Sequence, residues 1–155
     1  MPTSYDQVEY DSYPFAQSAP NRLATVATLL GLNVASPTNC RVLELGCSSG
    51  GNIIPLADQF ANSSFVGIDA SVKAVEKGQA SIAGSGLSNI ELRHANILDI
   101  DESYGQFDYI IIHGVFSWVP ANVQEKILEI FLADLIPMAW PTLVTTPILV
   151  GTFAA

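Results

Sequence analysis

A glycine- and serine-rich loop follows a short apolar run in the segment 42–52, which reads Val-Leu-Glu-Leu-Gly-Cys-Ser-Ser-Gly-Gly-Asn. The apolar run is typical of a buried strand, and Glu44 stands two residues before the first glycine. Glycines let the backbone turn tightly and approach a ligand closely. The helix that follows such a loop presents unpaired N–H groups. The segment predicts a strand, a ligand-binding turn and a helix, although an ordinary strand-to-helix turn has a similar composition.

The rest of the chain alternates apolar runs with segments of helical periodicity. Strands are predicted at 41–45, 64–68, 90–93 and 107–112. Helices are predicted from an N-cap at Ser18 to a stop at Gly31, and at 51–61, 71–83 and 122–135. This order predicts an α/β fold with a doubly wound parallel sheet. Ligands of such sheets bind at the carboxyl ends of the strands, where the strand order reverses.

The spacing of the glycines separates two kinds of cofactor site. A nicotinamide site needs G-x-G-x-x-G, and Gly46, Gly50 and Gly51 do not have this spacing. The Glu44 carboxylate would also repel a pyrophosphate, whereas it suits a ligand that carries an ammonium and a sulfonium. S-adenosylmethionine carries both groups. An NAD-binding Rossmann protein therefore stays the less favoured alternative.

The segment VLELGCSSGGN resembles motif I of class I S-adenosylmethionine-dependent methyltransferases. The pattern of that motif is an apolar run, an acid and an apolar residue, followed by G-x-G-x-G. Ser48 replaces the middle glycine of that pattern. The resemblance implies a Rossmann-like sheet, S-adenosylmethionine as cofactor, S-adenosylhomocysteine as product, and methyl transfer to an unidentified small molecule or protein. It places Glu44 near the methionine ammonium and the backbone of Gly46, Cys47 and Ser48 along the methionine and ribose. Gly50 belongs to the same cofactor loop.

Two later segments resemble further motifs of the family. Asp69 ends the second predicted strand, where the resemblance implies that it accepts hydrogen bonds from both ribose hydroxyls, with Ala70 beside it. The alternative is that Asp69 caps the helix that follows. The segment 95–99 is similar to the family's G-D-x-x-D segment, which places Asn96 at the adenine edge and Leu98 against its ring. Ile97, between them, is a further candidate cofactor contact. An asparagine amide can still bond the edge of that base.

The segment 107–120 resembles motif IV and the residues after it, at the strand end that faces the methyl group in this family. His113 stands there and is a candidate general base, because imidazole titrates near neutral pH. It is also a candidate cofactor contact, and a structural role is the alternative. Phe116 and Trp118 either wall the acceptor site or pack in the core.

Charge and cysteine content limit the partners. Acids outnumber bases 15 to 6, giving a net charge of −9, and nucleic-acid binding depends on Lys and Arg. We therefore expect no nucleic-acid partner. Cys40 and Cys47 form neither a metal clamp nor a disulfide framework, so no metal is expected and a reducing cytoplasm is the simplest compartment. The first residues lack the features of a secretory signal.

The two ends of the chain differ from its centre. Residues 1–17 are interpreted as an N-terminal arm, which resembles that of bacterial methyltransferases with a methyltransferase regulatory domain. The resemblance implies an arm that folds over the cofactor. Residues 18–137 are interpreted as a partial S-adenosylmethionine-binding domain. Residues 138–155 carry no charge, but prolines interrupt them and we expect no membrane span. Back-translation of this tail gives a strand-like peptide in another reading frame. We therefore predict a one-base slip in the gene near the codon for Pro137. We also predict that the sheet lacks its C-terminal strands. A truncated, non-catalytic binding fragment is therefore an alternative function.

Overall fold

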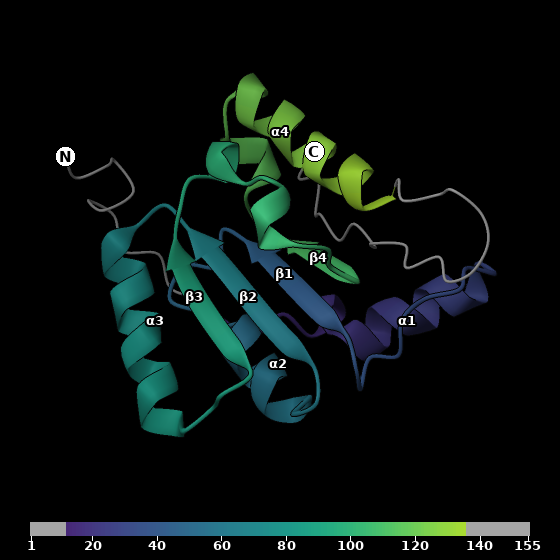
Figure 1. The fold of residues 1–155 in the computed structure, drawn as a ribbon, viewed down its shortest axis with the longest axis horizontal. Helices are drawn as coiled ribbons and strands as arrows, with labels where there is room; N and C mark the ends of the chain where they lie inside the picture. Colours follow the sequence, from purple (N-terminus) through teal and green to yellow (C-terminus); the bar gives the residue numbers. More distant parts are fainter. Residues whose placement is uncertain (1–11, 136–155) are drawn as a thin grey trace.

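The computed structural model describes residues 12–135 (Figure 1). The predicted N-terminal arm is described only from Ser12 onward, and the predicted out-of-frame tail 138–155 lies outside the described residues. The described strands are β1 (Arg41–Leu45), β2 (Ser64–Asp69), β3 (Ile90–His94) and β4 (Tyr109–Ile112). The described α-helices are α1 (Pro20–Leu29), α2 (Ile53–Gln59), α3 (Val72–Ser85) and α4 (Ala121–Leu135).

The four strands form one parallel sheet in the order β3-β2-β1-β4 (Figure 1). The chain runs from β1 through α2, β2 and α3 to β3 at one edge, and then returns to β4 on the other side of β1. The strand order therefore reverses between β1 and β4, which is where a ligand site is expected. This arrangement confirms the predicted doubly wound α/β fold.

The core has two layers because successive side chains of a strand point to opposite faces of the sheet. Val42 belongs to a buried cluster with residues of α1, α2 and α3. The next residue, Leu43, belongs to a second cluster with residues of α4. All four residues of β4 are buried, as expected for a strand that is covered on both faces.

One prediction about a helix end was wrong. Ser18 does not cap α1: it closes a short 3₁₀ turn, and Ala19 stands at the N-cap position before Pro20. Val72 of α3 is 40% exposed. Val75 and Gly78 are the buried residues of that helix. No helix within residues 12–135 is long and apolar enough to cross a membrane.

Candidate functional site

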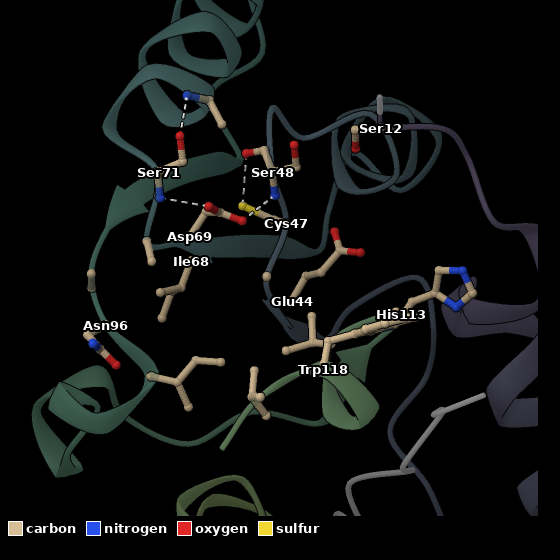
Figure 2. Close-up of a pocket in the computed structure, with 18 of the residues that line it drawn as sticks. Ser12, Glu44, Cys47, Ser48, Ile68, Asp69, Ser71, Asn96, His113 and Trp118 are labelled. Atoms are coloured by element: carbon tan, nitrogen blue, oxygen red, sulfur yellow. Dashed lines mark hydrogen bonds between the residues drawn. The ribbon is translucent and has the colours of Figure 1, made fainter. Parts of the chain in front are cut away.

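A cleft of about 1370 Å³ opens at the carboxyl ends of the strands (Figure 2). Nine of the ten predicted cofactor residues line it: Glu44, Gly46, Cys47, Ser48, Asp69, Ala70, Asn96, Ile97 and His113. Gly50 does not line it. The φ of Gly50 is +79°, and a Cβ there would lie 2.8 Å from Ile54 and 3.0 Å from Leu92. Glycine at position 50 therefore lets the loop turn closely against α2 and β3.

Glu44 is a buried carboxylate at the floor of the cleft, with only 4% of its surface exposed. Its Oε1 accepts a hydrogen bond of 2.7 Å from Asn52 Nδ2. Its Oε2 is buried and has no hydrogen-bond partner among the described residues. Burial raises the pKa of Glu44 to about 7; the Asn52 hydrogen bond opposes this shift and the charge of Asp69 adds to it. A cation placed at Oε2 would both satisfy that atom and favour the ionised carboxylate.

The loop after β1 is held against β2 by its own backbone. The N–H groups of Gly46 and Cys47 both donate to the carbonyl oxygen of Ile68, at 2.8 and 3.0 Å. Gly46 has a φ of +75°, and a Cβ there would overlap the side chain of Val115 in the loop after β4. Position 46 therefore requires glycine both for its backbone conformation and for its closeness to that loop.

Cys47 is buried in the same loop, and its Sγ donates to the carbonyl oxygen of Ser48 at 3.5 Å. Burial, with the charges of Glu44 and Asp69, raises the pKa of the thiol far above its ordinary value. The thiol is therefore protonated near neutral pH and is not an activated nucleophile.

Asp69 joins the first two loops of the cleft. Its Oδ2 accepts from the Ser48 backbone N–H at 2.7 Å, and its Oδ1 accepts from the Ser71 N–H at 2.8 Å. Ser71, not Asp69, is the N-cap of α3, because its side chain accepts from the Ala74 N–H. The alternative of Asp69 as the helix cap is therefore wrong, and its carboxylate is fixed at the edge of the cleft (Figure 2).

The loop after β3 forms another part of the lining. Asn96 Oδ1 accepts from the Leu98 N–H at 3.0 Å, so the group that Asn96 offers to a ligand is its amide NH₂. Ile97 is half-buried and Leu98 is 40% exposed, and both line the cleft. This combination of an amide and two aliphatic side chains suits a flat heteroaromatic ring.

His113 follows β4 and lies on the far side of the cleft from Asp69 (Figure 2). Its ring stacks on that of Phe15, with the ring centroids 3.9 Å apart and the planes 19° from parallel. Trp118, in the 3₁₀ turn Phe116–Trp118, lines the cleft and is 80% exposed. Phe116 instead packs partly buried against the α4 side of the core.

Several residues of the cleft were not predicted from the sequence. Asn52, which bonds Glu44, is one of them. Ser12 and Tyr13 of the N-terminal arm line the cleft, and the resemblance of this arm had implied a position over the cofactor. Lys73 and Lys77 of α3 also line it. The sequence placed Asn52 inside the predicted helix 51–61, whereas it stands just before α2, and nothing local shows that its amide reaches back to β1.

A Rossmann-like parallel sheet with a cleft at its switch point, and with carboxylates from β1 and β2 in that cleft, defines a nucleotide-cofactor-binding domain. Residues 42–137 match the family described as "Methyltransferase domain". The chain belongs to this family of S-adenosylmethionine-dependent methyltransferases.

Three known proteins show the range of similarity. An uncharacterized protein of Rickettsia prowazekii is 48% identical over 126 residues, which cover 81% of this chain and 23% of that protein. Human EEF1A lysine methyltransferase 2 is 31% identical over 91 residues, which cover 59% of this chain and 38% of that protein. The structure of PKMT2 from Rickettsia typhi in complex with AdoHcy matches with a TM-score of 0.79 and 41% identity, over 83% of this chain and 25% of that one. This chain spans less than half the length of each.

The residues in the cleft fit S-adenosylmethionine, the cofactor of this family. The buried Oε2 of Glu44, which has no hydrogen-bond partner within residues 12–135, suits the methionine ammonium. Gly46 adds no side chain of its own to the loop after β1. Asp69 offers a fixed carboxylate to hydroxyl groups, and Asn96 offers an amide to a base edge.

Proposed function

We propose that this domain binds S-adenosylmethionine in the cleft and transfers its methyl group to a nucleophilic atom of a small molecule or a protein. The bound cofactor supplies a methyl group activated by the neighbouring sulfonium. The protein supplies the binding contacts, the alignment of the acceptor and the exclusion of water, and alignment alone contributes much of the rate in such transfers.

The observation that carries this proposal is the Oε2 of Glu44, which no donor in the described part of the chain reaches. A buried carboxylate oxygen without a donor is costly, and this one is buried beside the cleft. The ammonium of the methionine part supplies the missing donor and the compensating charge. The interaction gains strength from the low local dielectric of a buried site.

The loops after β1, β2 and β3 are each assigned to a different part of the cofactor. We assign Asp69 to the two ribose hydroxyls, since each of its oxygens accepts one backbone N–H and has a second lone pair. Asn96 and Ile97 are assigned to the adenine, and Ala70, which follows Asp69 in the lining, to the ribose. The backbone of Gly46, Cys47 and Ser48 is assigned to the methionine and ribose, as in the sequence prediction.

The acceptor is assigned to the side of the cleft that follows β4, where His113 and Trp118 lie. The net charge of −9 disfavours a polynucleotide acceptor. Cys40 and Cys47 are free thiols, which suits a reducing cytoplasm.

A titration of the purified 155-residue protein with S-adenosylhomocysteine tests the proposal, with NAD as the control ligand. We expect saturable heat and a rise in thermal stability with S-adenosylhomocysteine alone. At a ligand concentration about 100 times the Kd, the added stability is about 2.7 kcal/mol. Glu44→Ala should abolish both signals. Binding of NAD, or no binding of S-adenosylhomocysteine by the folded protein, would overturn the proposal.

A further inference from the structure

Asn52 is a buried amide that connects three parts of the molecule. It stands just before α2 and is only 6% exposed. Its Nδ2 donates to Glu44 Oε1 at 2.7 Å and to the Ser18 hydroxyl at 3.0 Å. Its Oδ1 accepts from the Phe15 backbone N–H at 2.8 Å. The side chain thus bonds the cofactor carboxylate on one side and the N-terminal segment on the other.

Only a carboxamide can make these bonds together. The Glu44 carboxylate requires a donor, and the Phe15 N–H requires an acceptor. An aspartate would supply the acceptor but would place a second negative charge against Glu44. A leucine of similar shape would supply neither group. The chemistry of position 52 is therefore determined by both neighbours.

The segment 12–18 is held at the cleft by further contacts on either side of Asn52. Ser12 Oγ accepts from the Gly51 N–H at 3.0 Å, and the Ser12 carbonyl lies so close to Gly51 that a Cβ there would overlap it. Ser12 and Tyr13 line the cleft. Phe15 stacks on His113. The segment 12–18 therefore contacts the residues that follow β1 and also His113, which follows β4.

We propose that Asn52 is a positioning residue that couples binding of the cofactor ammonium at Glu44 to docking of the segment 12–18 across the cleft. The docked segment holds the Asn52 amide with its NH₂ toward Glu44, so that Oε1 is satisfied and Oε2 is left for the ligand. This inference rests on the proposed function, because it takes Glu44 as the ammonium site.

Coupling between two sites is reciprocal. If a docked segment favours the binding-competent Glu44, then S-adenosylhomocysteine must in turn stabilise the docked segment. Both directions can be measured in the intact chain without knowing the methyl acceptor.

The experiment compares Asn52→Leu and Asn52→Asp with wild type and with Asn39→Asp, which makes the same charge change at an exposed loop position. Circular dichroism checks that each variant folds. Calorimetry gives the affinity for S-adenosylhomocysteine between about pH 5.5 and about pH 8. Hydrogen exchange of the Phe15 amide, with and without the ligand, reports docking of the segment.

We expect Asn52→Leu to bind about tenfold or more weakly, because one bond to a charged oxygen is lost. The ligand should slow exchange of the Phe15 amide in wild type and not in this variant. Asn52→Asp should keep the protection of the Phe15 amide while weakening ligand binding, because it keeps the acceptor and loses the donor. Asn39→Asp should match wild type in both measurements.

The pH profile separates positioning from a general loss of stability. The Asn52 hydrogen bond lowers the pKa of Glu44, so the pH midpoint of ligand binding should rise in both variants at position 52. The other titratable groups of the cleft are Cys47 after β1, Asp69 after β2, Lys73 and Lys77 on α3, His113 after β4 and Tyr13. Glu44→Gln measures the pH dependence due to them.

The outcomes separate this inference from the proposed function. If wild type does not bind S-adenosylhomocysteine, or Glu44→Gln binds it as well as wild type does, both ideas fail. If wild type binds through Glu44 but Asn52→Leu keeps its affinity within twofold and its pH midpoint, the role of Asn52 alone is overturned. Equal ligand-induced protection of the Phe15 amide in wild type and Asn52→Leu also overturns it.

Discussion

The Ser48 backbone N–H donates to Asp69 Oδ2 at 2.7 Å, which ties the loop after β1 to the end of β2. Ser48 has a φ of +50° and is the one non-glycine residue with a positive φ among the described residues. The bond therefore holds the loop in a left-handed conformation that costs a non-glycine residue about 1 to 2 kcal/mol. Two residues proposed to contact the cofactor are thus positioned by each other.

Substitutions at Ser48 should follow the cost of a left-handed backbone. Ser48→Gly should change the free energy of unfolding by no more than about 1 kcal/mol, because relief of strain is offset by a more flexible unfolded chain. Ser48→Val should destabilise by about 2 kcal/mol or more, since a β-branched residue is a rare outlier at positive φ. Urea unfolding measures both. Equal stability of the two variants would contradict the left-handed conformation.

Asp69→Asn should affect both stability and binding. An asparagine has one carbonyl oxygen, so it cannot accept from the Ser48 and Ser71 N–H groups in the way that the carboxylate does. We expect a loss of about 1 to 3 kcal/mol in unfolding free energy and at least about tenfold weaker binding of S-adenosylhomocysteine. Asp58→Asn, on the exposed side of α2, is the matched control and should behave as wild type. If both variants bind alike, Asp69 is not a ribose ligand.

The pKa of Glu44 predicts how stability depends on pH. The folded value of about 7 lies above the ordinary value of 4.5. Between these values the folded protein keeps a proton that the unfolded chain releases, so stability falls as the pH rises through this window. At about 1.4 kcal/mol per pKa unit, the loss due to Glu44 is roughly 3 kcal/mol. Without ligand, Glu44→Gln should therefore be more stable than wild type at about pH 8.

Ligand binding should show the opposite dependence on pH. The ammonium requires the ionised carboxylate, so affinity for S-adenosylhomocysteine should increase as the pH rises through about 7 and then level off. Calorimetry over this range checks the expectation. Glu44→Gln should bind weakly at every pH. A wild-type affinity that does not change with pH would contradict a raised pKa of Glu44.

The sequence predicted the parts of the site whose signals are local. The strand Arg41–Leu45 has the predicted bounds, because its apolar residues and the glycine loop after it are both visible in one short segment. The network of Asn52 was missed because it joins residues up to 37 positions apart. Ser18 has the chemistry of a helix cap, but its hydroxyl bonds Phe15 and Asn52 instead. Local helix-capping preference could not show that Phe15 and Asn52 compete with α1 for the Ser18 hydroxyl.

Two glycines of α3 allow a matched test of its packing. A Cβ at Gly78 would overlap Leu92 and lie 2.7 Å from the Ser49 backbone oxygen, whereas a Cβ at Gly84 would meet nothing within 4 Å. Gly78→Ala should destabilise by about 1 to 3 kcal/mol, and Gly84→Ala should stabilise by about 0.5 to 1 kcal/mol. Chemical denaturation measures both. The two substitutions should change the free energy of unfolding in opposite directions. The reason is that the new methyl group meets other atoms at position 78 and open space at position 84.

Substitutions of His113 separate stacking from proton transfer. His113→Phe keeps an aromatic ring against Phe15 but cannot accept a proton, whereas His113→Ala removes the stack. We expect His113→Phe to bind S-adenosylhomocysteine within about threefold of wild type, and His113→Ala to bind more weakly and to lose about 1 kcal/mol of stability in the segment 12–18. Calorimetry and exchange of the Phe15 amide provide the two measurements.

Activity then decides whether His113 also acts as a base. A general base contributes about 10² to 10⁴ in rate, so with an acceptor in hand His113→Phe should lower kcat by at least about 10²-fold if the imidazole takes a proton. If His113→Phe keeps nearly full kcat while His113→Ala loses ligand affinity, the stack is the whole contribution of His113. The stack of His113 on Phe15, with the ring centroids 3.9 Å apart, favours this second outcome, because it gives the ring a packing role that phenylalanine also fills.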